Sequence, residues 1–219
     1  MNSIQNFFES LLFEIIFFFL FSSGLFALYL RKAKNSVNLK SIGIHHIHKK
    51  GQNIKNTINA IKSSRQIKVI AFMPYSFIYD YKELLVKKIK DGCNIKFLVC
   101  SPNSLLLKEL SQMERHVDND ISSQYDLLIN LLQGIKADAG NEATGSIEVR
   151  MYNTEIRNPA IICIDEKNNK SAFLTLSVPP YRSIDSIMIE YRDSNCDFVI
   201  NYFDAIWERH PNDLSLKLP

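Results

Sequence analysis

Three of the five histidines lie close together, at His45, His46 and His48. A cluster of histidines could bind a metal ion, but this run has no Cys and no clear carboxylate partner nearby, so we expect no metal site. With the two lysines that follow, the run could instead contact phosphate groups of a lipid or a nucleotide. We interpret residues 35–52, which contain these histidines, as a solvated basic connector.

Polar side chains follow the ends of several apolar runs in the chain. In α/β sheets, ligands gather at the carboxyl ends of the strands. An arginine at such a position could pair with phosphate and a tyrosine could stack on a base, although each polar residue could equally serve a turn or a helix cap. The candidate ligand-binding residues are Tyr75, Ser76, Ser101, Asn103, Arg157, Asn158, Ser177 and Arg182.

The chain lacks the short motifs of common catalytic sites, with no GxSxG, HExxH or P-loop sequence. Asp165 follows an apolar run and could be a hairpin residue as easily as a functional carboxylate. The four cysteines are scattered without a CxxC pair, which indicates a reducing compartment and no structural zinc. These observations predict no catalytic residue, no metal and no cofactor.

The hydrophobic pattern predicts the elements that must position these side chains. Helical spacing or strand-like apolar runs recur along most of the chain after residue 53. Their order favours an α/β fold, a mixed sheet sandwiched by helices, parallel at first and mixed or antiparallel later. The expected helices are residues 53–64, 77–92, 119–136 and 197–210, and the expected strands are residues 67–73, 94–100, 146–153, 160–166, 171–178 and 186–191.

The stretch from Leu11 to Leu30 has the length of about 20 apolar residues that a membrane-spanning helix needs. No Lys or Arg precedes it, so the positive-inside bias places the N-terminus outside and the rest of the chain in the cytoplasm. The absence of N-terminal positive charge favours an uncleaved anchor over a signal peptide. The basic residues that follow the span are Arg31, Lys32 and Lys34.

Two features lie inside the predicted span. The small residues Ser22, Ser23 and Gly24 allow close approach of two helices in lipid. Glu14 is costly there and either snorkels to the outer interface or faces a partner helix or a pore. The predicted domains are an anchor over residues 1–34, the connector over 35–52 and a cytosolic ligand-binding domain over 53–219.

The charge of the chain beyond the span is mildly basic. Of the 23 acidic residues, Glu9 and Glu14 lie in the first 30, which leaves 26 basic and 21 acidic residues, a net charge of +5. This balance suits an anionic ligand or lipid headgroups, but it is weak support for nucleic-acid binding.

Over most of residues 42–210 the order of segments resembles the phospholipase D-like domains of bacteria. The family's catalytic signature is H-x-K with an Asp beyond it, but the corresponding place reads Arg157-Asn158-Pro159-Ala160, and the H-x-K string at His48 precedes the first expected strand. The resemblance therefore implies this fold without its nucleophile. The matching segments are GIHHI, IKSSRQIKVIAFMPYSF, LLVKKIKDGCNIKFLVCSPNS, IEVRMYNTEIRNPAIICIDE and YFDAIWERH.

Degenerate phospholipase D-like domains fused to a membrane segment are similar to effectors of bacterial anti-phage defence. This resemblance implies a single-pass protein of the bacterial inner membrane that senses a cyclic or other nucleotide, rearranges as a homo-oligomer and perturbs the lipid bilayer. A partner protein from the same defence system is a further implication. Two alternatives stay open: a phosphodiesterase or nuclease that uses His45, His46 or His48, and an adaptor that docks a partner protein at the membrane.

Overall fold

The computed structural model of the chain describes residues 39, 43–49, 54–105, 118–153, 158–176 and 187–210. One compact unit extends from Gly43 onward. Within the described ranges, no helix is long and apolar enough to cross a membrane. The predicted span and its basic flank lie outside the described residues, and with them Glu14, Ser22, Ser23, Gly24, Arg31, Lys32 and Lys34.

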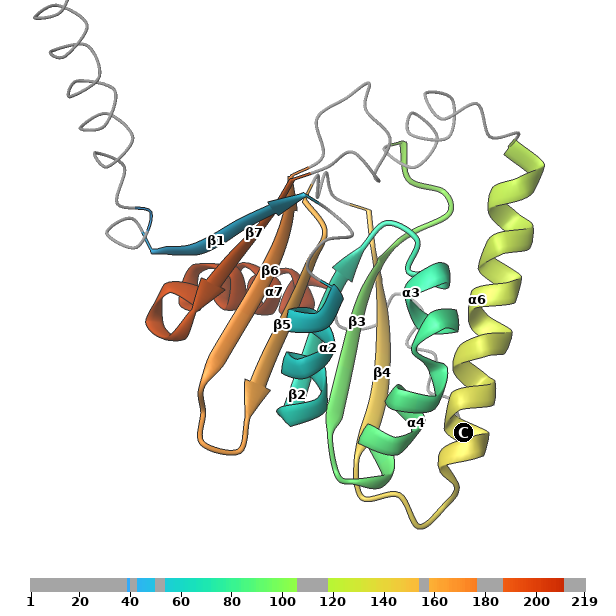
Figure 1. The fold of residues 1–219 in the computed structure, drawn as a ribbon. Coiled ribbons are helices and arrows are strands. Elements are labelled where there is room, and N and C mark those ends of the chain that lie inside the picture. The colour runs from blue at the N-terminus through green and yellow to red at the C-terminus, as the bar shows by residue number, and fades with distance from the viewer. Residues whose placement is uncertain are drawn as a thin grey trace, which may run out of the picture. The chain divides into compact units, whose positions relative to one another are not determined.

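A mixed sheet of seven strands forms the centre of this unit (Figure 1). In chain order the strands are β1 (Ile44–Lys49), β2 (Ser64–Ala71), β3 (Asn94–Cys100), β4 (Ser146–Tyr152), β5 (Ala160–Asp165), β6 (Lys170–Leu176) and β7 (Ile187–Arg192). Their order across the sheet is β1-β7-β6-β5-β2-β3-β4. The pairs β2–β3 and β3–β4 are parallel, and the other four pairs are antiparallel, which confirms the predicted mixed sheet.

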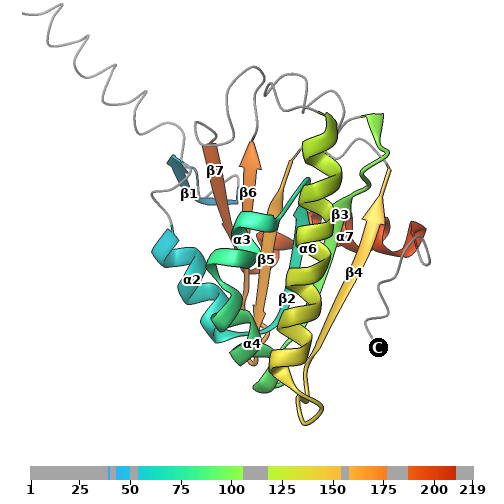
Figure 2. The same ribbon diagram turned by 90° about the vertical axis from the view of Figure 1, so that its right-hand side faces the viewer.

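Helices cover both faces of the sheet, which confirms the predicted sandwich (Figures 1 and 2). One face carries α2 (Ile54–Ser63), α3 (Tyr75–Asp80), α4 (Lys82–Lys90) and α6 (Asp118–Ala139). The other face carries α7 (Asp197–Arg209), which follows the short 3-10 helix η3 (Asp193–Cys196).

The central strands are apolar because both of their faces are covered. Successive side chains of a strand point to opposite faces. In β2, Ile67 and Val69 are buried, whereas Lys68 between them points toward α7, where its Nζ lies 2.7 Å from Oδ1 of Asp204. A lysine can occupy this covered strand because its ammonium group reaches a carboxylate at the edge of α7.

The single helix predicted over residues 77–92 is two helices, α3 and α4, separated at Tyr81. Tyr81 has φ −112° and ψ 17°, outside helical geometry. The first helix also begins earlier than predicted, at Tyr75, directly after Pro74 at the N-cap position. Both α3 and α4 pack against α6.

The interpretation of residues 35–52 as a connector is wrong for its central part, because residues 44–49 form β1. This strand pairs antiparallel with β7, with Ile47 opposite Ile189, and the compact unit therefore begins at Gly43 rather than at residue 53. Gly43 has φ +82°, a conformation that favours glycine. The histidines suggested a solvated linker, but polar side chains are also common on strands at the edge of a sheet.

Candidate functional site

The expected candidate site lies where several strands of the sheet end together. Parallel pairing aligns Ala71 of β2 with Val99 of β3, and antiparallel pairing places Ala160 at the start of β5 beside Ile70. The chain leaves or enters the sheet here through residues 72–76, 101–104 and 158–159, which we call the strand-end edge. The structure thus places Tyr75, Ser76, Ser101, Asn103 and Asn158 at one edge, while their role in binding stays a prediction.

The aromatic candidate at the strand-end edge is Tyr75, the first residue of α3. Its ring stacks on that of Tyr79 one turn later, with 6.0 Å between the centroids and 21° between the planes. Tyr79 is 63% exposed and Ser76 is also exposed, so the stacked pair presents an aromatic surface to solvent. Such a surface can hold a planar base.

The polar candidates after β3 have two different roles. Ser101 is buried, its backbone N donates to the carbonyl of Tyr152 at 2.9 Å, and its hydroxyl accepts from the backbone N of Asn103 at 3.4 Å. These contacts make Ser101 a turn residue. Asn103 is exposed, and its side chain is therefore accessible to a ligand.

The remaining candidates lie at the start of β5 and beyond β6. Asn158 is half-buried and precedes Pro159, whose carbonyl accepts a hydrogen bond of 2.8 Å from the backbone N of Thr175. This bond ties the start of β5 to β6. Arg157, Ser177 and Arg182 lie outside the described residues.

A buried cluster of hydroxyl and thiol groups lies beneath the strand-end edge. The Sγ of Cys100 is 2.9 Å from the Oγ of Ser104, and the hydroxyl of Tyr152 donates to the carbonyl of Ala71 at 3.3 Å. The hydroxyl of Tyr125 is buried and has no hydrogen-bond partner among the residues that the structure describes. Burial raises the pKa of Cys100, Tyr125 and Tyr152 above their ordinary values, so the Cys100 thiol stays protonated and is a poor nucleophile.

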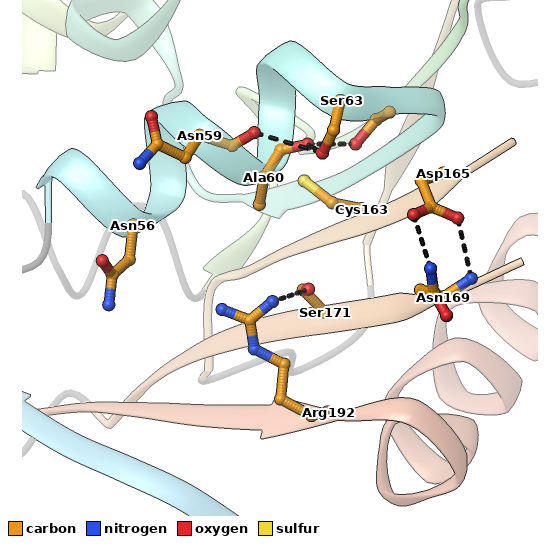
Figure 3. A pocket seen from close by; sticks show the side chains of 10 residues that line it. Asn56, Asn59, Ala60, Ser63, Cys163, Asp165, Asn169, Ser171 and Arg192 are labelled. Carbon is orange, nitrogen blue, oxygen red and sulfur yellow. Dashed lines mark hydrogen bonds between the residues drawn. The ribbon is translucent and has the colours of Figure 1, made fainter. Parts of the chain in front are cut away.

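A second candidate site is a pocket of about 350 Å³ between α2 and the antiparallel half of the sheet. Figure 3 shows Arg192 of β7 reaching into it below α2. We call it the α2 pocket, and its lining residues are Asn56, Asn59, Ala60, Ser63, Ser64, Cys163, Asp165, Asn169, Ser171 and Arg192. The sequence pattern did not reveal this pocket because its lining comes from five elements, α2, β2, β5, β6 and β7, in separate parts of the chain. The local signals were the polar residues Ser171 in β6 and Arg192 at the end of β7.

Asp165 has the contacts of a hairpin residue. Its Oδ1 accepts from the backbone N of Lys167 and of Asn169, both at 2.8 Å, and its Oδ2 accepts from the side chain of Asn169 at 2.8 Å. The Asn169 amide in particular holds the pKa of this carboxyl below its ordinary value. Asn168 completes the turn with φ +62°, a conformation that asparagine tolerates.

A buried carboxylate stands behind the arginine of the α2 pocket. The side chain of Glu190 is 0% exposed, and its Oε1 accepts from Nε of Arg192 at 2.7 Å and also from Nη2. Its Oε2 lies 3.2 Å from Nε2 of His48 on β1. One histidine of the sequence cluster thus pairs with a carboxylate 142 residues away. Across the part of the chain that the structure describes, no group of three or more His, Cys, Asp or Glu side chains could hold a metal ion.

Comparison with known proteins finds similar solved structures but no matching family model or curated protein. No protein-family model matches the chain, and a search of curated proteins gives no match either. One similar solved structure is Nuc from Salmonella typhimurium, a phospholipase D family member, at 13% identity and a TM-score of 0.43 over 75% of this chain and 92% of that one. Another is TrmBL2, an archaeal chromatin protein whose structure shows a novel mode of DNA binding, at 14% identity and a TM-score of 0.46. The chain spans 63% of the length of TrmBL2, and 84% of this chain is covered.

Proposed function

We propose that this chain is a ligand sensor held at the bacterial inner membrane, whose domain from Gly43 onward binds a nucleotide without turning it over. The observation that supports this proposal best is the strand-end edge. There the ends of β2 and β3 and the start of β5 are aligned, so that the half-buried Tyr75, stacked on the exposed Tyr79, and the accessible amide of Asn103 lie at one edge of the sheet. A base can stack on such tyrosines while amide groups bond its edge.

In this proposal the ligand acts by selecting one arrangement of an oligomer. A ligand can shift an equilibrium between two arrangements only by binding one of them more tightly than the other. Residues 1–34 would be the anchor, and the rearranged assembly would disrupt the membrane, as the resemblance to effectors of anti-phage defence implies. Deletion of residues 1–30 should therefore abolish toxicity of the overexpressed chain in bacteria, and retained toxicity would contradict the anchor's role.

Thermal unfolding of the purified full chain, measured with a panel of cyclic di- and oligonucleotides, tests the sensor itself. A ligand at 100 times its Kd stabilises the folded state by about 2.7 kcal/mol, which corresponds to roughly 5–10 °C for a chain of this size. Tyr75→Ala and Asn103→Ala should reduce the shift. Asn201→Ala, an exposed position on α7 at the opposite face, should leave it unchanged.

The ligand panel also separates this proposal from its rivals. A shift with one nucleotide and no release of products supports the sensor. Hydrolysis of the nucleotide would contradict the sensor and support the phosphodiesterase hypothesis. No shift with any nucleotide would contradict the sensor and favour an adaptor that binds a protein partner.

A further inference from the structure

We propose that the α2 pocket is an oxyanion-binding site, in which Arg192 receives the carboxylate or phosphate group of a small ligand. Arg192 is the last residue of β7, and the lining residues Asp165 and Ser171 lie near the end of β5 and the start of β6. These strand positions are at the opposite end of the sheet from the strand-end edge. This pocket is therefore a separate site that does not depend on nucleotide binding there.

The guanidinium group of Arg192 is fixed in place. Its Nε and Nη2 bond Oε1 of the buried Glu190, and its Nη1 donates to Oγ of Ser171 at 2.6 Å. Bonds on two sides of the planar group set its orientation, so little entropy is lost when a ligand binds. Figure 3 shows the Nη1 and Nη2 end of the group directed into the pocket, toward α2.

The end of the guanidinium that faces the pocket has the geometry of an oxyanion site. Nη1 and Nη2 each carry two hydrogens, and the contacts with Ser171 and Glu190 use one on each nitrogen. The two remaining N–H groups can donate to the two oxygens of a carboxylate or to two oxygens of a phosphate. The Arg192 side chain is 36% exposed, so a small ligand can reach it from solvent.

Two side-chain amides on α2 form the opposite wall of the pocket. Asn56 and Asn59 lie one turn apart and both line the pocket, and neither amide has a hydrogen bond to another described residue. Each amide offers two donors and one acceptor, which can bond a further ligand oxygen or a hydroxyl group. The volume of about 350 Å³ accommodates a small organic anion.

The carboxylates of Asp165 and Glu190 near the pocket do not prevent an anion from binding. Both oxygens of Asp165 already accept N–H bonds within the hairpin turn, which disperse its charge. Glu190 is fully buried behind Arg192 and acts as the group that orients the guanidinium. A planar, oriented arginine with its own carboxylate support favours a bidentate ligand over a monatomic anion such as chloride.

Titration calorimetry of the purified full chain tests this site with inorganic phosphate and with succinate, against potassium chloride at matched ionic strength. We expect saturable binding of phosphate or succinate and none of chloride. The stronger of the two ions identifies the natural group as a phosphate or a carboxylate. Saturation by neither ion below about 10 mM would overturn the proposal, because a bidentate arginine site should bind more tightly than that.

Three variants locate the binding. Arg192→Lys keeps a positive charge beside Glu190 but loses the planar pair of donors, and we expect about tenfold weaker binding. Asn59→Asp places a negative charge on the exposed α2 wall, with a similar expected loss. Asn201→Asp is the matched control, since it makes the same change at an exposed position of α7 on the other face of the sheet.

The outcomes of these variants decide where the ion binds. Weaker binding in Arg192→Lys and Asn59→Asp with unchanged binding in Asn201→Asp supports the α2 pocket. Equal binding in Asn59→Asp and Asn201→Asp shows that the ion binds elsewhere and overturns the proposal. Because Arg192→Lys alters a buried cluster, its cooperative unfolding is checked first, and if it fails to fold the two asparagine variants give the answer alone.

Discussion

Replacement of Arg192 by methionine should destabilise the fold far more than its partial exposure suggests. The arginine bonds Glu190, whose side chain is 0% exposed, with Nε 2.7 Å from Oε1. Methionine keeps much of the aliphatic volume but removes the charge and the donors. The carboxylate is then left in the interior without its guanidinium partner, although its contact with His48 is kept.

The structure sets the expected magnitudes. An unpaired buried charge costs several kcal/mol, so Arg192→Met should lower the free energy of unfolding by about 3 kcal/mol. Glu190→Gln should cost less, about 1.5 kcal/mol, because the 36% exposed guanidinium can turn to water. The double variant removes both charges and should cost about 2.5 kcal/mol, which corresponds to a coupling of about 2 kcal/mol between the two side chains.

Urea unfolding of the full chain, followed by circular dichroism, measures all four species of this cycle. A second cycle serves as the control, Arg65→Met with Glu166→Gln. That pair has the same 2.7 Å distance between Nε and Oε1, but its side chains are 46% and 65% exposed. Solvent screening should reduce its coupling to about 0.5 kcal/mol.

The comparison of the two cycles isolates burial as the cause. If the Arg192–Glu190 coupling is no larger than that of the exposed pair, the burial argument is refuted. A stability of Arg192→Met equal to that of the unaltered chain would refute it as well, since the carboxylate would then need no cation.

Three further changes follow from the described core. Burial raises the pKa of the Cys163 thiol to about 12 from an ordinary 9.0, so the unfolded chain loses this proton at a lower pH than the folded chain. The contribution of this group to the free energy of unfolding should therefore be complete below pH 9 and be lost as the pH rises toward 12. Urea titrations at each pH measure this change. Gly145→Ala should prevent stable folding because its Cβ would overlap backbone carbonyls, whereas Gly134→Ala on α6 should change the melting temperature little or raise it. His48→Ala should cost about 1–2 kcal/mol through loss of its carboxylate partner, and His46→Ala, an exposed position on the same strand, less than about 0.5 kcal/mol.

Local sequence pattern was sufficient for most of the elements. The strand over residues 94–100 has the predicted bounds, and the other expected strands and helices agree within a few residues, apart from the break at Tyr81. The reason is that a strand covered on both faces must be apolar along its whole length, and a helix on one face must repeat its apolar residues every turn. These signals are contained in short stretches of chain.

The order of the strands needed the tertiary structure. The segment order indicated a parallel first half and an antiparallel second half, but not that β5 pairs with β2 and so joins the two halves. Strand β1 was missed for a related reason. Its histidines have the composition of a solvated linker. Only the folded structure shows that the backbone of β1 pairs with β7 and that His48 contacts Glu190.

The two candidate sites also differ in how much of each could be predicted from the sequence. The sequence alone determined that each polar candidate follows or precedes a strand, because a residue next to a strand must lie at the end of that strand. The tertiary structure decided that the ends of β2 and β3 and the start of β5 meet at one edge. The tertiary structure alone decided the α2 pocket, whose lining comes from α2, β2, β5, β6 and β7. Side chains from such distant segments meet because the sheet places β5, β6 and β7 in succession near α2, and no local pattern in the chain encodes that order.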